Sequence, residues 1–242
     1  MSPQNLPARI AEVQERVQRA CERAGRNAQS VTLLAIGKAQ PLDLLGAAAA
    51  CGLEHFGESY LQEALRKIDA LRERGLTWHF VGRLQANKTR PIAEAFDWVH
   101  ALDRPKDAER LAAQRPGHAP PLNVCLQVNL AGESTKGGAA PSELAGLAAR
   151  VAALPRLALR GLMCIPPEET DPARQRAWFA QLRRLRDELN AGGARLDTLS
   201  MGMSGDFEAA ILEGATIVRL GTALFGPRSP QAGERAAGAF AR

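Results

Sequence analysis

An almost continuous apolar run begins at residue 31 and reads Val31-Thr32-Leu33-Leu34-Ala35-Ile36-Gly37-Lys38. A run of this length is typical of a strand that is buried on both faces, as strands of parallel sheets are. Pro41 has no backbone N–H to donate, so strand pairing should stop close to it. Lys38 is therefore expected at the carboxyl end of an interior strand, where α/β folds place their functional groups.

Short apolar segments alternate with helical patterns along the rest of the chain. The expected strands are 31–37, 54–56, 78–81, 98–101, 122–129, 158–163, 198–200 and 216–220. The clearest helical patterns cover 6–25, 42–51, 61–74, 106–114, 141–153, 172–190 and 206–213. Eight strands that alternate with helices predict an α/β fold, a single (β/α)8 TIM-type barrel with an extra N-terminal helix. The alternative, an open doubly wound sheet, lacks a G-x-G-x-x-G run after its first strand.

The length of 242 residues suits one such barrel, since barrels of this type have about 250 residues. We expect a single domain over 1–242, with a leading helix in 1–30, the barrel in 31–226 and a C-terminal tail in 227–242. No low-complexity linker divides the sequence.

The composition is that of a globular protein, with 45% hydrophobic and 24% charged residues. A net charge of +5 would suit an anionic ligand. The basic residues are spread over amphipathic helices such as 181–189, where leucines form the buried stripe, so we expect no nucleic-acid binding.

The four cysteines, Cys21, Cys51, Cys125 and Cys164, form no C-x-x-C pair, so reduced thiols are expected rather than disulfides or a zinc site. The N-terminus lacks the pattern of a signal peptide, and no apolar run is long enough to span a bilayer. We expect a cytoplasmic protein that does not contact membranes.

Lys38 is the first candidate functional residue. An ammonium at the mouth of a buried strand is partly desolvated, which lowers its pKa and makes the amine a nucleophile toward carbonyls. The alternative is a lysine whose side chain leaves the strand and extends into solvent.

The segments after the seventh and eighth strands favour the functional interpretation. Barrels often bind phosphate with these two loops. Here Ser200-Met201-Gly202-Met203-Ser204 follows one strand, with Ser204 expected to cap a helix that starts near Gly205, and Gly221-Thr222 follows the other. The alternative for these hydroxyls is simple helix capping.

Arg219 directly precedes the last of these loops. A lysine able to form a Schiff base, a phosphate cradle and a basic residue beside a ring nitrogen together describe a pyridoxal phosphate site. The alternative for Arg219 is an ion pair with a nearby carboxylate.

Long motifs of the sequence closely resemble the pyridoxal phosphate homeostasis protein family. They are Leu199-Ser200-Met201-Gly202-Met203-Ser204-Gly205-Asp206-Phe207-Glu208-Ala209-Ala210-Ile211, Val218-Arg219-Leu220-Gly221-Thr222-Ala223-Leu224-Phe225-Gly226, Trp78-His79-Phe80-Val81-Gly82-Arg83-Leu84-Gln85-Ala86-Asn87-Lys88 and Gly161-Leu162-Met163. The resemblance spans almost the whole chain. That family is similar to the barrel domain of alanine racemase and binds pyridoxal 5'-phosphate without established catalytic activity.

The resemblance implies a role for each candidate residue. Lys38 would form the Schiff base and Arg219 would face the pyridine nitrogen. The phosphate would be surrounded by Ser200, Ser204, Gly221 and Thr222. The family usually has serine and threonine around its lysine, where this chain has Gly37 and Ala39, and often asparagine at the position of Ser59.

The resemblance thus implies a protein of intracellular pyridoxal phosphate homeostasis that holds the cofactor without turnover, has no catalytic residues and binds no metal. Apoenzymes that depend on the cofactor would be possible recipients, and we expect a monomer. The alternatives are a cofactor-dependent amino-acid racemase and a Schiff-base aldolase. Racemisation needs two acid–base groups, and the single tyrosine, Tyr60, follows the second strand.

His55, His79 and His100 lie in or beside strands without the spacing of metal ligands.

Overall fold

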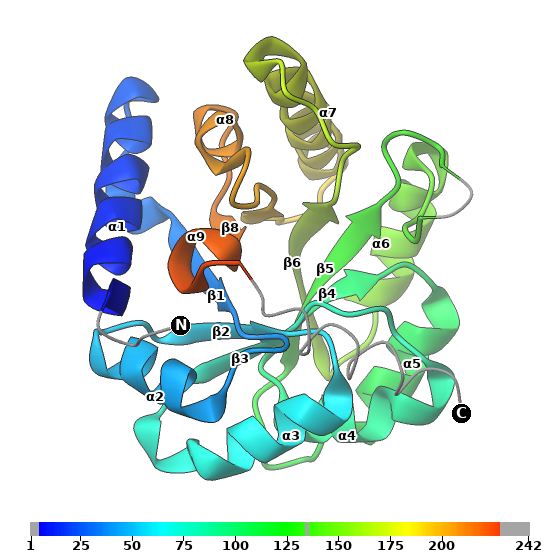
Figure 1. The fold of residues 1–242 in the computed structure, drawn as a ribbon. Helices are drawn as coiled ribbons and strands as arrows, with labels where there is room; N and C mark the ends of the chain where they lie inside the picture. Colours follow the sequence, from blue (N-terminus) through cyan, green and yellow to red (C-terminus); the bar gives the residue numbers. More distant parts are fainter. Residues whose placement is uncertain (1–4, 134–135, 228–242) are drawn as a thin grey trace.

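The computed structural model describes residues 5–133 and 136–227, so most of the expected C-terminal tail lies outside the described residues. Eight parallel strands close into a barrel in the order β1 to β8 (Figure 1). The strands are β1 (Thr32–Ile36), β2 (His55–Glu58), β3 (Thr77–Phe80), β4 (Trp98–Leu102), β5 (Leu122–Val128), β6 (Leu157–Cys164), β7 (Thr198–Ser200) and β8 (Ile217–Leu220). The predicted (β/α)8 barrel is confirmed, with each strand within two residues of its expected bounds.

Helices follow the strands and cover the outside of the barrel. They are α1 (Leu6–Arg23), α2 (Leu42–Ala50), α3 (Leu61–Ala70), α4 (Thr89–Ala95), α5 (Pro105–Gln114), α6 (Leu144–Ala152), α7 (Pro172–Ala191), α8 (Phe207–Leu212) and α9 (Thr222–Phe225). Short 3-10 turns at Arg72–Arg74 and Pro141–Glu143 account for parts of the longer helices expected from the sequence. Helix α4 is absent from the clear helical patterns of the sequence.

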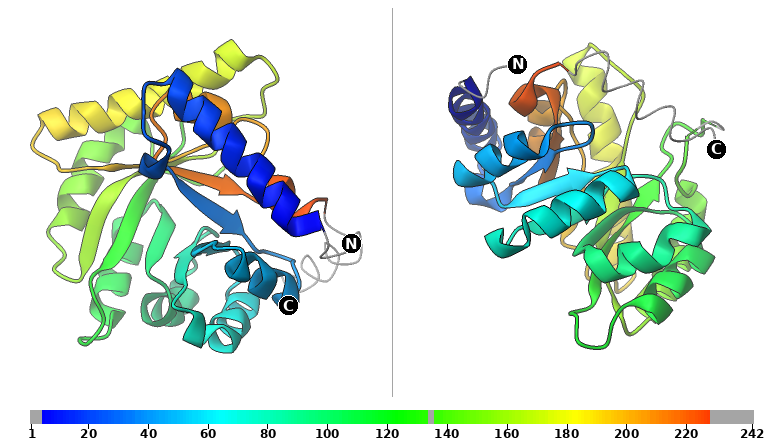
Figure 2. Two further views of the ribbon diagram at one scale, coloured as in Figure 1. Left: turned by 90° about the vertical axis from the view of Figure 1, so that its left-hand side faces the viewer. Right: turned by 60° about the horizontal axis from the view of Figure 1, so that its bottom comes forward.

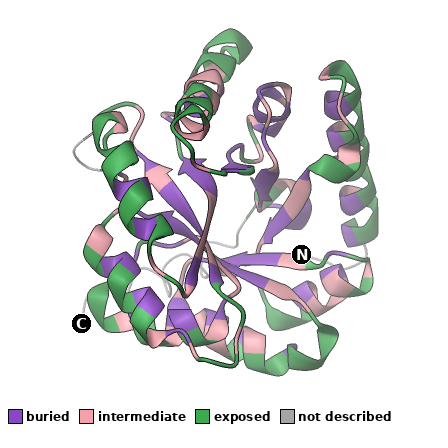
Figure 3. Ribbon diagram, turned by 180° about the vertical axis from the view of Figure 1, so that it is seen from behind, coloured by how far each residue is buried: buried purple, intermediate pink, exposed green. Residues whose placement is uncertain are grey.

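The leading helix α1 buries one face, which includes Ile10, Val13 and Val17. It packs against α8, α9 and α2, and Figure 2 shows it alongside β1 and β8. The helix after the last strand, α9, has only four residues, and α1 packs beside it on the outside of the barrel. Figure 3 shows buried residues in purple on the strands and exposed residues in green on the outer helices. Most buried apolar side chains form one large cluster, and Ala101, Cys125 and Met163 form a small second one.

The first strand ends where the sequence predicts. β1 pairs with β2 on one side and β8 on the other, and its Leu34 and Ala35 are fully buried. Pro41 stands immediately before α2, in an extended conformation that starts the helix. Gly52, just past α2, has a φ of +87°, a value that favours glycine at a helix end. All four cysteines are free thiols.

Candidate functional site

Lys38 lies in a tight turn at the carboxyl end of β1. The amide of Gly37 still donates to the Gly57 carbonyl of β2 (2.9 Å), and the Gln40 amide donates back to the Gly37 carbonyl (2.9 Å). Ala39 in this turn has a φ of +59°, a left-handed conformation that costs an L-residue roughly 1–2 kcal/mol. Its amide donates to Glu63 Oε1 of α3 (2.9 Å). The half-buried Lys38 is therefore presented by a fixed turn.

Beneath this turn lies an ionic cluster of the buried Glu58 and Lys67 and the half-buried Glu63. Lys67 Nζ donates to Glu58 Oε1 (2.8 Å), to Glu63 Oε1 (2.5 Å) and to the Gly37 carbonyl (2.7 Å). Because Lys67 and Glu58 are 4% and 0% exposed, these bonds are strong and tie the Lys38 turn to α3. None of the expectations from the sequence included this cluster. Its only signal is the Glu63–Lys67 spacing of four residues on one helix.

Burial raises the pKa of Glu58 to about 7, although Lys67 opposes the shift. One cation is shared by two carboxylates, so the cluster does not fully compensate both negative charges. Glu58 Oε2 is buried and has no hydrogen-bond partner among the described residues. The positive charge of Lys38 also favours the ionised form of Glu58, so the candidate functional amine and this carboxyl interact electrostatically.

The Glu58 carboxyl also occupies the space over Gly37. A Cβ at Gly37 would lie 2.7 Å from Glu58 Oε1 and 2.8 Å from Leu45 Cδ2. Both atoms end flexible side chains, so a serine at this position would require them to shift. The absence of a side chain beside Lys38 thus allows Glu58 to approach the backbone of the turn.

The raised pKa predicts a specific pH dependence of stability. In the folded state Glu58 stays protonated at pH values above 4.5, where it would ionise in the unfolded chain. The stabilising contribution of this group is therefore complete below pH 4.5 and is lost as the pH rises through 7. Glu58→Gln should remove this loss, which amounts to a few kcal/mol at about 1.4 kcal/mol per pKa unit. Urea unfolding at pH 5 and pH 8 measures it. Equal pH dependence in both proteins would show that Glu58 is ionised throughout.

Arg219 of β8 is 5% exposed and its guanidinium is fixed by three hydrogen bonds. Its Nη1 donates to the Ser200 carbonyl (2.7 Å) and to Ser200 Oγ (3.0 Å), and Nη2 donates to the Cys164 carbonyl (2.8 Å). The predicted alternative, an ion pair with a carboxylate, is not found among the described residues. The three bonds use three of the five N–H groups, which leaves two for a ligand.

The loops after β7 and β8 meet, as expected for a phosphate cradle. Ser204 Oγ accepts from the Ala223 amide in the first turn of α9 (3.1 Å). The prediction that Ser204 caps the next helix is wrong: α8 begins at Phe207. There Asp206 Oδ1 accepts from the Met203 amide (2.6 Å) and holds the entry turn in place of a serine cap.

Gly221 and Thr222 stand at the same end of the barrel as Lys38. The pairing of β1 with β8 places a Cβ built on Gly221 only 3.6 Å from Cβ of Ile36, two residues before Lys38. Thr222 is exposed and opens α9. The structure therefore brings together Lys38, Ser204, Gly221 and Thr222 around the ends of β1, β7 and β8.

Ser200 differs from the other predicted phosphate contacts. It is fully buried in β7. Its hydroxyl lies between Arg219 Nη1 (3.0 Å) and His100 Nδ1 (2.7 Å). Both partners are side chains of the barrel interior, so this hydroxyl supports Arg219 from below.

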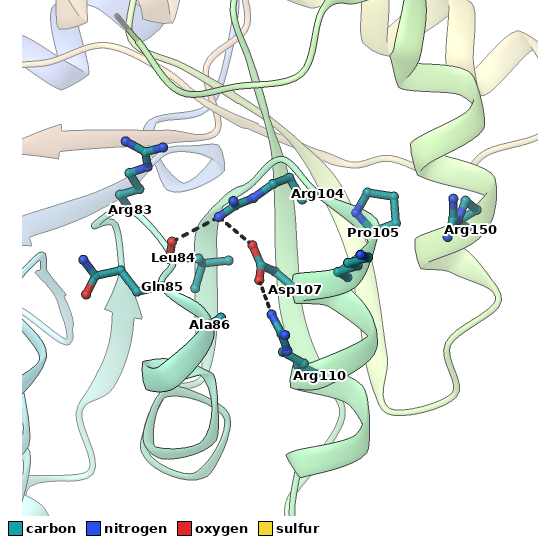
Figure 4. A pocket seen from close by; sticks show the side chains of 10 residues that line it. Arg83, Leu84, Gln85, Ala86, Arg104, Pro105, Asp107, Arg110 and Arg150 are labelled. Carbon is teal, nitrogen blue, oxygen red and sulfur yellow. Dashed lines mark hydrogen bonds and ion pairs between the residues drawn. The ribbon is translucent and has the colours of Figure 1, made fainter.

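A basic pocket of about 630 Å³ opens at the loops after β3 and β4 (Figure 4). Its charged lining residues are Arg83, Arg104, Lys106, Asp107, Arg110 and Arg150. Arg104 Nη2 and Arg110 Nη1 pair with the buried Asp107 at 2.9 and 3.4 Å, which neutralises part of the charge. None of the predicted site residues lines this pocket.

The part of the chain that the structure describes contains no group of three histidine, cysteine or acidic side chains arranged to hold a metal ion. Within the same residues, no helix is long and apolar enough to cross a bilayer.

Comparisons with known proteins agree on one family. Residues 9–229 match the family described as alanine racemase, N-terminal domain. The chain is 57% identical to the pyridoxal phosphate homeostasis protein of Pseudomonas aeruginosa over 219 residues, which cover 90% of this chain and 94% of that protein. It is 46% identical to the protein of the same name from Escherichia coli K12, with 90% and 95% covered.

Solved structures show the same fold. The structure of PipY from Synechococcus elongatus with PLP bound has a TM-score of 0.78 and 38% identity, and the match covers 87% of this chain and all of that one. Alanine racemase from Corynebacterium glutamicum has a TM-score of 0.63 at 18% identity, with 89% of this chain and 60% of that one covered. The latter likeness concerns the fold alone.

Proposed function

The chain belongs to the pyridoxal phosphate homeostasis protein family, and we propose that it binds pyridoxal 5'-phosphate at the mouth of its barrel and takes part in intracellular homeostasis of this cofactor. What supports this role most is the clustering of Lys38, the Arg219 guanidinium and the bridged loops of Ser204 and Thr222 at one end of the barrel. The PLP bound to PipY supports the choice of ligand.

The residues present fit the cofactor's chemistry. The aldehyde needs an amine, and Lys38 offers one in a turn held by Lys67 and Glu63. The ring nitrogen needs a partner, and Arg219 retains two N–H groups after its three bonds to Ser200 and Cys164. The phosphate dianion needs donors, which the Thr222 hydroxyl and the backbone at Gly221 supply beside Ser204.

We assign the following roles to these side chains. The Lys38 amine binds the aldehyde carbon covalently as a Schiff base, with loss of water. Arg219 donates to the ring nitrogen, while Ser204, Gly221 and Thr222 hold the phosphate. Ser200 holds Arg219 rather than the phosphate, because its hydroxyl already contacts Arg219 and His100. When bound, the cofactor supplies an electrophilic carbonyl conjugated to an electron-accepting ring.

The same residues favour holding the cofactor over turnover. A guanidinium stays protonated and donates, so the ring nitrogen beside Arg219 stays unprotonated and the ring is a weaker electron sink. We therefore propose that the protein is not an enzyme. Incubation of the loaded protein with L-alanine in deuterated water tests this. Fast deuterium incorporation at the α-carbon with formation of D-alanine, abolished in Lys38→Ala, would establish the racemase alternative instead.

Further parts of the proposal concern the cell. We propose that the protein acts in the cytoplasm as a monomer and that apoenzymes dependent on the cofactor receive it. Sedimentation of the loaded protein measures the oligomeric state. Transfer is tested by mixing loaded protein with an apoenzyme and following the recipient's activity, with an equal concentration of free cofactor as the control.

Thr222→Ala should weaken binding of pyridoxal phosphate roughly 10- to 100-fold, because a hydrogen bond to a charged group contributes about 1.5–3 kcal/mol. Binding of pyridoxal, which lacks the phosphate, should change little. Thr222→Ser keeps the hydroxyl at this exposed position and should bind both ligands as the wild type does. Dissociation constants from fluorescence titration measure the effect. Equal weakening for both ligands would place Thr222 outside the phosphate site.

A further inference from the structure

Three histidines, one from each of three neighbouring strands, form a hydrogen-bonded chain across the barrel interior. His55 Nδ1 of β2 lies 3.0 Å from His79 Nε2 of β3, and His79 Nδ1 lies 2.9 Å from His100 Nε2 of β4. His100 Nδ1 lies 2.7 Å from Ser200 Oγ, to which Arg219 donates. This histidine chain of His55, His79 and His100 thus ends on Ser200, which contacts Arg219, the proposed partner of the ring nitrogen.

Burial disfavours the protonated form of all three histidines. Burial lowers the pKa of His79 well below its usual value, and the neighbouring imidazoles of His100 and His55 add to the shift. Burial lowers the pKa of His100 to about 3, with a further contribution from the Arg219 charge. The pKa of His55 is also lowered by burial, against the opposing charges of Glu54 and Asp97. Each neutral imidazole carries one N–H and one acceptor nitrogen.

Two proton arrangements satisfy these contacts, because each tautomer dictates the next. If Ser200 donates to His100 Nδ1, all three histidines carry the proton on Nε2. If His100 Nδ1 donates to Ser200, all three carry it on Nδ1, and Ser200 Oγ then accepts twice. In that second arrangement the Ser200 hydroxyl proton has no acceptor among the described residues, which is costly for a fully buried group.

We propose that the histidine chain is a positioning device for Arg219: all three imidazoles carry the proton on Nε2, Ser200 donates into the chain, and its lone pair thereby stays directed at Arg219 Nη1. The consequence for ligand binding rests on the proposed function. Ser200 and His100 are positioning residues that keep the two remaining N–H groups of Arg219 available to a pyridine nitrogen. Sequence spacing shows none of this, because closure of the barrel brings the residues together.

Tautomers in the ligand-free protein test the arrangement without any cofactor. Two-bond proton–nitrogen spectra of labelled protein should show His55, His79 and His100 protonated on Nε2, with His79 and His100 neutral from pH 5 to pH 8. His118 in an exposed loop serves as the internal reference, and His79→Phe and His100→Phe supply assignments. An Nδ1–H tautomer at His100 would overturn the proposal, whether or not the protein binds pyridoxal phosphate.

Ligand binding tests the positioning role. Ser200→Ala should weaken binding of pyridoxal phosphate roughly tenfold, the effect of one hydrogen bond to a charged group. Binding of a benzaldehyde phosphate analogue, with carbon in place of the ring nitrogen, should not change. His118→Gln is the control and should bind both as the wild type does. Equal weakening for both ligands would show general damage to the site and overturn the positioning role, whereas no binding in the wild type would instead refute the proposed function.

Discussion

Lys38→Ala should abolish covalent attachment of pyridoxal phosphate while leaving the barrel folded. The turn around Lys38 is held by bonds that do not use its side chain, from Lys67 Nζ to the Gly37 carbonyl and from the Ala39 amide to Glu63. The substitution therefore removes the amine and its charge near Glu58, but not the hydrogen bonds that hold the turn. The violet absorption band that a lysine Schiff base of the cofactor gives should disappear. Borohydride, which reduces such a Schiff base to a stable bond, should leave no peptide labelled with the cofactor.

The control for this experiment is Lys106→Ala, which removes an exposed lysine from the basic pocket at the same end of the barrel. It should keep the band at full intensity. Circular dichroism confirms that both variants are folded. A folded Lys38→Ala protein that still shows the band, with label on another lysine, would move the anchor and refute the site. Residual noncovalent binding is compatible with the proposal, because Arg219 and the phosphate loops remain.

Most of the architecture could be predicted because each strand is a short apolar run and most helices cover several turns. Helix α4 was the exception. It has seven residues with Pro91 in its first turn, too few to show a clear helical period, and proline is accepted there because the first turn needs no amide donor. The short α9, with four residues, is missing from the clear helical patterns for the same reason of length.

The residues proposed to contact the cofactor could be predicted from the sequence, but the residues that hold them in position could not. Lys38 and Arg219 stand out because each adjoins a strand end and a loop of small residues. The Glu58 cluster depends on α3 folding back under the turn, and the histidine chain depends on the pairing of β2, β3 and β4. Ser204 was misjudged because a hydroxyl can cap a helix remote in sequence, here α9, when Asp206 already holds the local turn.

The geometry around Arg219 depends on how closely β6 approaches β7. Gly161 of β6 pairs with Thr198 of β7, and two residues on, Met163 pairs with Ser200. The next residue, Cys164, supplies the carbonyl that Arg219 Nη2 contacts. Gly161 also follows a register shift between β5 and β6. The spacing at Gly161 therefore affects the relative positions of Ser200 and Cys164, which provide the three acceptors of Arg219.

Gly161→Ala should destabilise the protein by roughly 3 kcal/mol or more, because an overpacked backbone contact cannot relax as a side chain can. A Cβ at this position would lie 1.8 Å from the Thr198 carbonyl oxygen and 2.6 Å from its carbon. The two strands would have to separate and lose pairing beside Ser200. Urea unfolding followed by circular dichroism measures the change in free energy.

Gly146→Ala is the matched control, since Gly146 lies exposed in α6 and an added Cβ would meet nothing within 4 Å. It should stabilise the protein by up to about 1 kcal/mol through helix propensity. Wild-type stability in Gly161→Ala would mean that β6 and β7 can separate without cost. If Gly161→Ala folds at low temperature, it should also bind pyridoxal phosphate more weakly than Gly146→Ala does. Separation of β6 and β7 would move Ser200 and the Cys164 carbonyl away from the Arg219 guanidinium.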